Sequence, residues 1–389
     1  MTTRVAEASF FLHNGCMSES NLPFVLTVII GLAIIMMVSL FSVYNSPEKK
    51  EGAAASIIEK SAEGYILTWE NGVGPMPLLS PSRMRDVSVG GGHACAISRD
   101  NKAFCWGDGE DGQLGTDGTD DVQNPTIEVA GERKWQAIAA GEKHSCGIAD
   151  DGQAFCWGAG DSGQLGNGGF TGSAAPVLLA GDDLFISISA GEKHSCGITS
   201  EGLARCWGNG ETGQLGDGGR ENQSSPSALA GDMRFLDVSA GYDHTCAISQ
   251  DGTAWCWGSN KDGQLGDGGA DDSEIPASVQ SDQPFSAIAA GKGYSCALSQ
   301  TGEAFCWGSA HSGGSNKPFS VGKGPFQQIT AGKTHTCALK GGGIWCWRMG
   351  PPKSDFMASG PFRLPVHLAP LDRFAKISVR DRLATAIVK

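Results

Sequence analysis

A repeat of about 50 residues runs through most of the sequence and limits the folds that it can adopt. Each copy has a His-x-Cys element (Tyr-x-Cys in the fifth), then a turn of the Asp-Gly type, then Cys-Trp, the pattern of a β-hairpin. The Cys-Trp-Gly or Cys-Trp-Arg triplets lie at 105–107, 156–158, 206–208, 256–258, 306–308 and 346–348. Short alternating segments upstream, and a strand around the preceding proline, bring each unit to about four strands. Because glycine is abundant (57 residues) and charged residues make up only 18%, we predict an all-β fold.

The two ends of the chain together supply a seventh unit beside the six complete ones. Residues 377–379 and 383–387 match the first half of a unit and stop where the turn should follow. The second half is found at 63–69, so that Thr385 and Thr68 take the two cysteine positions. Joining both ends in one sheet closes a ring and removes the exposed edges of an open array. We therefore predict a seven-bladed β-propeller of about four-stranded blades over residues 63–389.

The repeat resembles that of the regulator-of-chromosome-condensation family. In the fourth unit the motifs are Gly-Tyr-Asp-His at 241–244, Asp-Gly at 251–252, Trp-Gly-Ser-Asn at 257–260 and Gly-Gln-Leu-Gly at 263–266. The resemblance covers about residues 63–389 and implies the same seven-bladed propeller, here in a bacterial-type, membrane-anchored member with a cysteine pair per blade. The founding member's exchange activity on a small GTPase is one function that it implies. The sixth unit departs from the pattern, with Ser-Gly-Gly at 312–314 in place of Gly-Gln-Leu-Gly, and so does the closing blade.

Twelve of the 13 cysteines fall into six pairs, five of them ten residues apart and the last nine apart. In the predicted hairpins the two members of a pair lie directly opposite, at a separation that a disulfide accepts. We predict the disulfides Cys95–Cys105, Cys146–Cys156, Cys196–Cys206, Cys246–Cys256, Cys296–Cys306 and Cys337–Cys346. Each closes a short loop and stabilises the fold by roughly 2–3 kcal/mol.

Zinc and reduced core thiols are the alternatives for these cysteines. His144, Cys146 and Cys156 would offer three ligands on one face of a hairpin. However, the fifth unit keeps both cysteines with Tyr294 at the histidine position, and the closing unit loses both cysteines together. The cysteines behave as pairs without the histidine, so we predict disulfides, no metal and no cofactor. Calcium in acidic loops such as 117–121 stays open, although the spacing differs from that of an EF-hand.

The N-terminal part contains a candidate membrane anchor. Residues 22–44 carry no charge over 23 positions, enough for a transmembrane helix. Residues 1–21 then form a short cytoplasmic segment and 45–62 a linker. Because disulfides in this number indicate an oxidising compartment, we place the propeller in the periplasm or outside the cell. Lys49 and Lys50, which follow the helix, argue weakly for the opposite orientation, and a cleaved signal peptide is the alternative to an anchor.

The net charge of −13 argues against nucleic-acid binding, because such a surface repels phosphates. The sequence shows no nucleophile–base set, phosphate loop or carboxylate pair outside the repeat, so we predict no catalytic residues and no enzyme. The tryptophans at 69, 106, 157, 207, 257, 307 and 347 recur in every blade, which predicts packing between neighbouring blades.

The hairpin geometry predicts a binding face where the variable loops gather. One end of every blade carries the loops that enter and leave the hairpin, and the Asp-Gly turns lie at the other end. We expect the centre of this loop face to present Lys143, Lys193, Tyr242, Asp243, Lys292, Lys333 and Arg380. Acidic residues lie farther out: Asp108, Glu110, Asp111, Asp161, Glu211 and Asp262. An insertion at 349–361 breaks the repeat and is a further candidate contact.

These features favour a membrane-anchored extracytoplasmic interaction or scaffold module, which binds a protein, peptide or glycan through the loop face. The alternatives are a nucleotide exchange factor for a small GTPase and an extracytoplasmic hydrolase or lyase that uses loop carboxylates. An exchange factor would require a cytosolic or nuclear propeller with reduced cysteines.

Overall fold

The computed structural model describes residues 65–70, 76–308, 315–348, 374–380 and 383–388. The predicted segments 1–21, 22–44 and 45–62, and the insertion at 349–361, lie outside these residues. Within the described part of the chain, no helix has the length and apolar character needed to cross a membrane. The transmembrane helix therefore stays a prediction.

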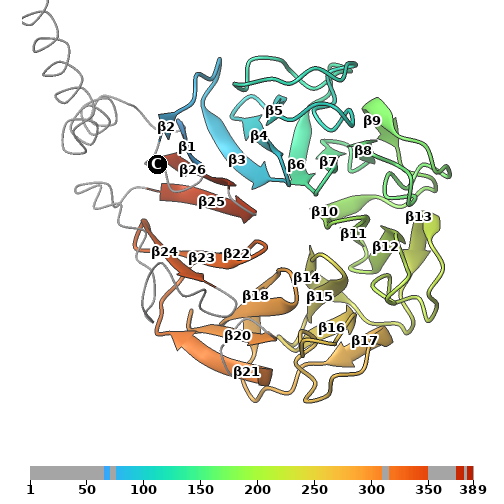
Figure 1. The fold of residues 1–389 in the computed structure, drawn as a ribbon, viewed down its shortest axis with the longest axis vertical. Helices are drawn as coiled ribbons and strands as arrows, with labels where there is room; N and C mark the ends of the chain where they lie inside the picture. Colours follow the sequence, from blue (N-terminus) through green and yellow to red (C-terminus); the bar gives the residue numbers. More distant parts are fainter. Residues whose placement is uncertain (1–64, 71–75, 309–314, 349–373, 381–382, 389) are drawn as a thin grey trace, which may run out of the picture. The chain divides into compact units, whose positions relative to one another are not determined.

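Seven antiparallel sheets form the blades of a propeller, as the repeat predicts (Figure 1). Blade 1 is β3–β5, blade 2 β6–β9, blade 3 β10–β13, blade 4 β14–β17, blade 5 β18–β21 and blade 6 β22–β24; blade 7 combines β25, β26, β1 and β2. Successive innermost strands contact one another around the whole ring, from β3 to β25 and back to β3. Blades 1 and 6 have three strands and the others four, counted over the described residues.

The strands occupy equivalent places in each repeat. The innermost strands are β3 (Met84–Val89), β6 (Trp135–Ala140), β10 (Phe185–Ala190), β14 (Phe235–Ala240), β18 (Phe285–Ala290), β22 (Gln328–Ala331) and β25 (Phe374–Arg380). The second strands are β4 (His93–Ser98), β7 (His144–Ala149), β11 (His194–Thr199), β15 (His244–Ser249), β19 (Tyr294–Ser299), β23 (His335–Lys340) and β26 (Leu383–Val388). The third strands are β5 (Ala103–Gly107), β8 (Ala154–Gly158), β12 (Ala204–Gly208), β16 (Ala254–Gly258), β20 (Ala304–Gly308), β24 (Gly343–Arg348) and β1 (Ile66–Glu70). The outer strands are β9 (Ser173–Leu178), β13 (Gln223–Ala228), β17 (Ser273–Ser278), β21 (Ser315–Gly322) and β2 (Met76–Pro77).

Both ends of the described chain meet in blade 7, as the sequence predicts. β1 pairs antiparallel with β26, and Thr68 lies directly opposite Thr385. The Thr68 hydroxyl donates a hydrogen bond to Ala384 O at 3.3 Å, whereas the buried Thr385 hydroxyl has no partner among the described residues. The closing blade is thus held by strand pairing and packing, with threonines where the other blades have cysteines.

Each of the other six blades contains one disulfide between its second and third strands. The paired cysteines lie directly opposite in the strand register, with Cα–Cα distances of 4.0–4.1 Å. In five blades a three-residue turn joins these strands, and one of its residues adopts a positive φ, as at Gly152 (85°). In blade 6 the two-residue turn Gly341-Gly342 has positive φ at both positions, which matches the nine-residue spacing.

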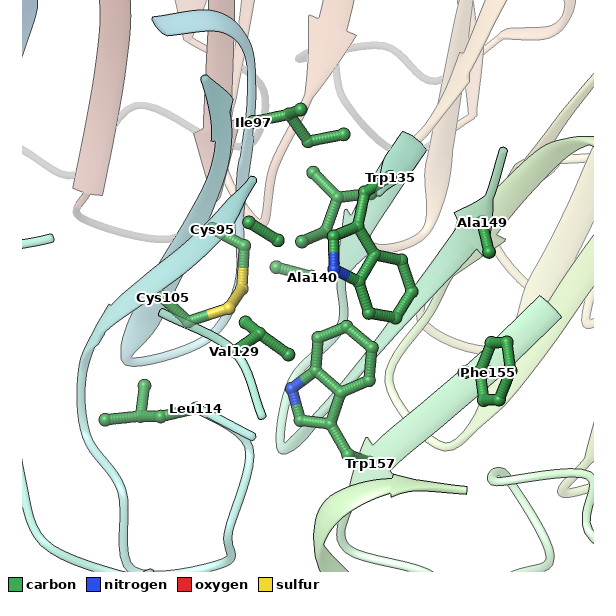
Figure 2. Close-up of a cluster of buried hydrophobic side chains, with 12 residues drawn as sticks. Cys95, Ile97, Cys105, Leu114, Val129, Trp135, Ala140, Ala149, Phe155 and Trp157 are labelled. Atoms are coloured by element: carbon green, nitrogen blue, oxygen red, sulfur yellow. A yellow bond between two sulfur atoms is a disulfide. The ribbon is translucent and has the colours of Figure 1, made fainter. Parts of the chain in front are cut away.

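Neighbouring blades pack through a tryptophan on the third strand. Figure 2 shows the first such junction, where the Cys95–Cys105 disulfide of blade 1 packs beside Trp135 and Trp157 of blade 2. The two tryptophan rings are 5.5 Å apart between centroids. Trp157 is fully buried, and its Nε1 donates a hydrogen bond to Gln113 O at 2.9 Å. Equivalent bonds join Trp207 to Gln164, Trp257 to Gln214 and Trp307 to Gln264.

Packing at this junction explains the residues of the Gly-Gln-Leu-Gly motif. Its leucine, such as Leu114, is fully buried between the blades, and its glutamine supplies the accepting carbonyl. Its last glycine, Gly115, has a φ of 69°, and a Cβ there would lie 2.7 Å from Trp157 Nε1. Only glycine fits this close approach. In the departing unit the motif position 312–314 lies outside the described residues, and Trp347 Nε1 has no hydrogen-bond partner within them.

The closing blade can be tested by giving it the missing disulfide. We expect the double substitution Thr68→Cys/Thr385→Cys to form a seventh bridge, because the two positions are directly opposed. It would close a loop of more than about 300 residues and raise the free energy of unfolding by about 5 kcal/mol, the upper end of the range for disulfides. Denaturant unfolding with and without reductant measures the gain. Each single substitution should show none, and a double variant that oxidises without becoming more stable would contradict closure of the ring by the pairing of β1 with β26.

Candidate functional site

The loop face is formed by the segments that enter and leave each hairpin. In blade 2, residues 141–143 join β6 to β7, and the paired residues His144 and Gly158 lie at the same end. The loop from Gly158 to Ser173 returns to this end as well, since these two residues are paired. The register repeats in blades 3 and 4, so that the predicted separation of loop end and turn end is confirmed there.

A layer of buried histidines supports the loop face. His93 Nε2 lies 2.8 Å from Ser145 Oγ of the next blade, and Ser145 donates its proton to Gln113 O. The serine therefore accepts from the histidine, so that Nε2 carries the ring proton. His144, His194 and His244 repeat this contact with Ser195, Thr245 and Ser295 at 2.8–2.9 Å. In blade 5, Tyr294 reaches the next blade directly and donates to Gly332 O and His335 O.

These histidines belong to the framework. Burial, with a smaller contribution from neighbouring positive charge, lowers the pKa of His93 and of His144 to about 3; burial does the same to the pKa of His194. The adjacent cysteines are bound in disulfides, which rules them out as zinc ligands in this oxidised state. Over the residues that the structure describes, no group of three or more His, Cys, Asp or Glu side chains has the arrangement of a metal site.

Arg380 occupies a position where the other six blades have glycine. It ends β25 and precedes Leu383 by three residues, as Gly90 precedes His93 and Gly141 precedes His144. A Cβ at Gly90 would lie 2.4 Å from Gly141 O and 2.4 Å from the His93 ring, so that blade has no room for a side chain. The closing blade has leucine in place of histidine, and the arginine side chain extends across the ring.

The Arg380 side chain connects blade 7 to three other blades. Its Nη1 donates to Ala190 O at 3.1 Å and to Ala140 O at 3.5 Å. Its Nε lies 3.5 Å from Glu142 Oε2, and its guanidinium carbon lies 5.0 Å from the Tyr242 ring centroid. Lys292 Nζ lies 5.5 Å from the same ring, which gives Tyr242 a second cation. Arg380 and Tyr242 are buried, at 7% and 5% exposure.

The other predicted site residues form a surface around this centre. Lys143, Lys193, Lys292 and Lys333 are exposed, and Asp243 is half-buried. Lys143 forms an ion pair with Asp111 at 3.0 Å, so that one predicted outer acid lies beside one predicted inner base. Asp108, Glu110, Asp161, Glu211 and Asp262 are exposed on the loops that follow the third strands.

Sequence reasoning missed two acidic residues at the centre. Glu142 and Glu192 occupy the same repeat position as Tyr242, Lys292 and Lys333, the residue after the glycine. Lys143 and Lys193 lie one residue farther on. The centre of the loop face therefore combines acidic residues from blades 2 and 3 with basic residues from blades 5 and 6. Comparing equivalent repeat positions could have shown this division before the structure.

A family model described as the RCC1-like domain matches residues 70–347, which is most of the chain. The chain belongs to the RCC1-like domain family. This RCC1-like domain is 33% identical over 136 residues to the E3 ubiquitin-protein ligase HERC2 of Mus musculus, an alignment that covers 33% of this chain and 3% of HERC2. It is 36% identical over 93 residues to the mitochondrial RCC1 domain-containing protein RUG3 of Arabidopsis thaliana, covering 24% of this chain and 21% of RUG3. The chain thus spans only a small part of these relatives.

Solved structures share the whole ring. Human WBSCR16 superposes with a TM-score of 0.73 at 19% identity, over 85% of this chain and 99% of that one. Yeast RCC1 (Prp20), from its complex with Kap60, gives a TM-score of 0.70 at 19% identity, over 85% and 90% of the two chains. At 19% identity, the similarity to these structures establishes only that the RCC1-like domain has the same fold.

The buried histidines predict that the domain loses stability in mild acid. In the unfolded chain a histidine takes up a proton below about pH 6.5, whereas in the fold the pKa of about 3 keeps His144 neutral. Each such histidine therefore lowers the free energy of unfolding by about 1.4 kcal/mol for every pH unit between the two pKa values, which amounts to about 2 kcal/mol at pH 5. We expect His144→Asn, which keeps a donor for Ser195, to lose less stability than the wild type between pH 7 and pH 5. Urea unfolding at both pH values measures the difference.

Asp237 of β14 should affect the pH dependence of stability in the opposite direction, which the same experiment can measure. Burial raises the pKa of its carboxyl group to about 6. Its contribution to stability is present below about pH 4 and is lost as the pH rises through about 6. Asp237→Asn should therefore steepen the loss on acidification that His144→Asn reduces. Equal slopes in the wild type and both variants would contradict these assignments.

Proposed function

We propose that this RCC1-like domain is an extracytoplasmic protein-binding module, held at a membrane by residues 22–44. The observation that carries the compartment is the set of six disulfides, one in each blade that is not the closing one. Every pair is buried and lies within one hairpin, so each can form as its blade folds. Disulfides in this number persist in oxidising compartments.

The loop face supports a protein as the partner. The framework beneath it repeats from blade to blade, while the residues on it change in charge: Glu142 and Glu192 on one side, Lys292 and Lys333 on the other. Such a mixed face offers complementary contacts to a partner that is large enough to cover several blades. The yeast Prp20 structures, titled for a complex with Kap60 and for binding to Gsp1p and histones, are consistent with protein binding by propellers of this kind.

The compartment is tested by counting free thiols. We expect the purified full-length chain, denatured and alkylated without reductant, to take up a label at Cys16 alone, and to be labelled at all 13 cysteines after reduction. Mass spectrometry resolves the two states. Protease added to intact cells should also release the propeller, if it lies outside the cytoplasm. Labelling of the six cysteine pairs without reductant would overturn the extracytoplasmic assignment. It would favour the alternative function of a nucleotide exchange factor, which needs a reducing compartment.

The binding face is tested by charge reversal. Lys193 and Lys292 are exposed on the loop face, and Lys134 is an exposed lysine at the turn end of blade 2. We expect Lys193→Glu/Lys292→Glu to lower the recovery of a cross-linked protein partner by about tenfold or more, since reversing charges opposite a complementary surface costs several kcal/mol. The control Lys134→Glu should leave recovery unchanged. Unchanged recovery with the double variant, or an equal loss with the control, would reject the loop face as the contact.

A further inference from the structure

The seven innermost strands surround a cavity of about 350 Å³ along the ring axis. Every blade contributes to its wall through residues of β3, β6, β10, β14, β18, β22 and β25. Arg380 and Tyr242 line its end at the loop face, and Asp86 and Lys376 line it toward the turn end, where they form an ion pair at 2.9 Å. The innermost strands rise by about 3.3 Å per residue, so the four positions from Lys376 to Arg380 give a length of roughly 13 Å.

Hydroxyl groups line the middle of this cavity. Ser88, Ser239 and Ser378 each accept a hydrogen bond from a backbone N–H of the next blade, at 2.9–3.0 Å. A hydroxyl that accepts in this way keeps its own proton for a further acceptor. The wall thus offers donors to an anionic or carbonyl-rich ligand, and the surrounding side chains are mostly small.

Arg380 has unused donors at the end of this cavity. Its Nη1 forms hydrogen bonds, whereas Nε and Nη2 are buried and have no hydrogen-bond partner among the residues that the structure describes. Glu142 Oε2 lies 3.5 Å from Nε and forms an ion pair with it, but it accepts no hydrogen bond from the described residues. Buried guanidinium groups normally have their donors satisfied. The Nε–Nη2 edge presents two parallel N–H groups, the arrangement that fits a carboxylate.

Ring closure alone does not require this arginine. Six blades make the equivalent junction with glycine, and the inner strands contact each other in the same way there. The arginine is therefore a local addition to the framework that brings a positive charge to the end of a cavity lined with donors. At the other end of the cavity Asp86 and Lys376 pair with each other, so only the Arg380 end favours an anionic group.

We propose that the cavity binds an elongated ligand by its single carboxylate, held on the Nε–Nη2 edge of Arg380. A short peptide in an extended conformation with a free C terminus has the right length and chemistry: three residues span about 10 Å. The peptide carbonyls would accept from the serine hydroxyls, and a far end without a second carboxylate would lie near the Asp86–Lys376 pair. This site lies beneath the centre of the loop face and shares Glu142 with it, whereas the exposed lysines Lys193 and Lys292 that test the protein contact do not line the cavity.

The test uses the full-length chain in detergent and trialanine as the probe. We expect trialanine with a free carboxylate to bind, as measured by isothermal titration calorimetry, and trialanine amide to bind at least about tenfold more weakly, because it lacks the charge-assisted pair. Acetate serves as a second probe: binding of acetate as tight as that of trialanine would overturn the elongated ligand, because a small carboxylate would then suffice. Equal binding of acid and amide, or no binding of either at a ligand concentration of about 10 mM, would also overturn the proposal.

Variants separate a binding role of Arg380 from a structural one. Arg380→Lys keeps the charge but loses the planar fork, and should weaken binding of the free acid by about tenfold. Glu142→Gln removes the negative charge that competes for the same edge, and should strengthen binding several-fold. Arg205→Gln, at an arginine that pairs with Asp183 on blade 3, is the matched control and should bind as the wild type does.

Glu142→Gln distinguishes the two roles even if Arg380→Lys folds poorly. If Arg380 serves only to hold blades together, with Glu142 as its partner, Glu142→Gln should lower the melting temperature and leave trialanine binding unchanged or absent. That result, or wild-type affinity in a folded Arg380→Lys protein, would overturn the proposal.

Discussion

The propeller depends on one interaction that is repeated between blades: a backbone carbonyl of one blade accepts two hydrogen bonds from the next. Gln113 O accepts from Trp157 Nε1 and from Ser145 Oγ, both fully buried. The serine in turn accepts from His93 of the first blade, so the contact runs in both directions across the junction. Each donor and acceptor would be costly to bury alone, which means that a blade is satisfied only when its neighbour is present. The stability of the ring is thus shared between junctions.

Much of this fold could be predicted because the repeat makes local rules visible seven times. Cysteine spacing and turn length together indicated the hairpin register, and the match of Thr68 and Thr385 to cysteine positions indicated the closing blade, which the strand pairing confirms. Contacts across the ring were out of reach of the same reasoning. The partner of each of the four buried histidines is a hydroxyl about 50 residues away, and Arg380 contacts Ala140 and Ala190, 240 and 190 residues away. Such contacts depend on how the ring curves, which no single unit encodes.

In the candidate site, too, the features within one repeat unit could be predicted and the contacts across the ring could not. The loop end and its exposed lysines followed from hairpin geometry, but Arg380 and Tyr242 were expected on the surface and are buried. Arg380 is buried because its side chain, at a position that is glycine in the other six blades, extends across the ring to Ala140 and Ala190, and the Tyr242 ring packs against its guanidinium group. From the sequence, the closing blade was noted only to depart from the repeat pattern, and the replacement of glycine by Arg380 was not singled out. Its effect on the central cavity appears only when the inner strands of all seven blades are in place.

The disulfides join residues that are close in the sequence, whereas the strand pairing that closes the ring joins residues that are far apart. This difference affects the order of folding. Every disulfide joins residues nine or ten positions apart, so each can form within a hairpin soon after it is synthesised. The pairing of β1 with β26 joins residues far apart in the chain, as in the Thr68–Ala384 hydrogen bond, separated by 316 positions. On its β26 side the first strand therefore has no partner until the last strand has been made, while the blades between them are already oxidised. Such a chain would pass through a folded but open intermediate whose lifetime is set by the arrival of its own C-terminal strand.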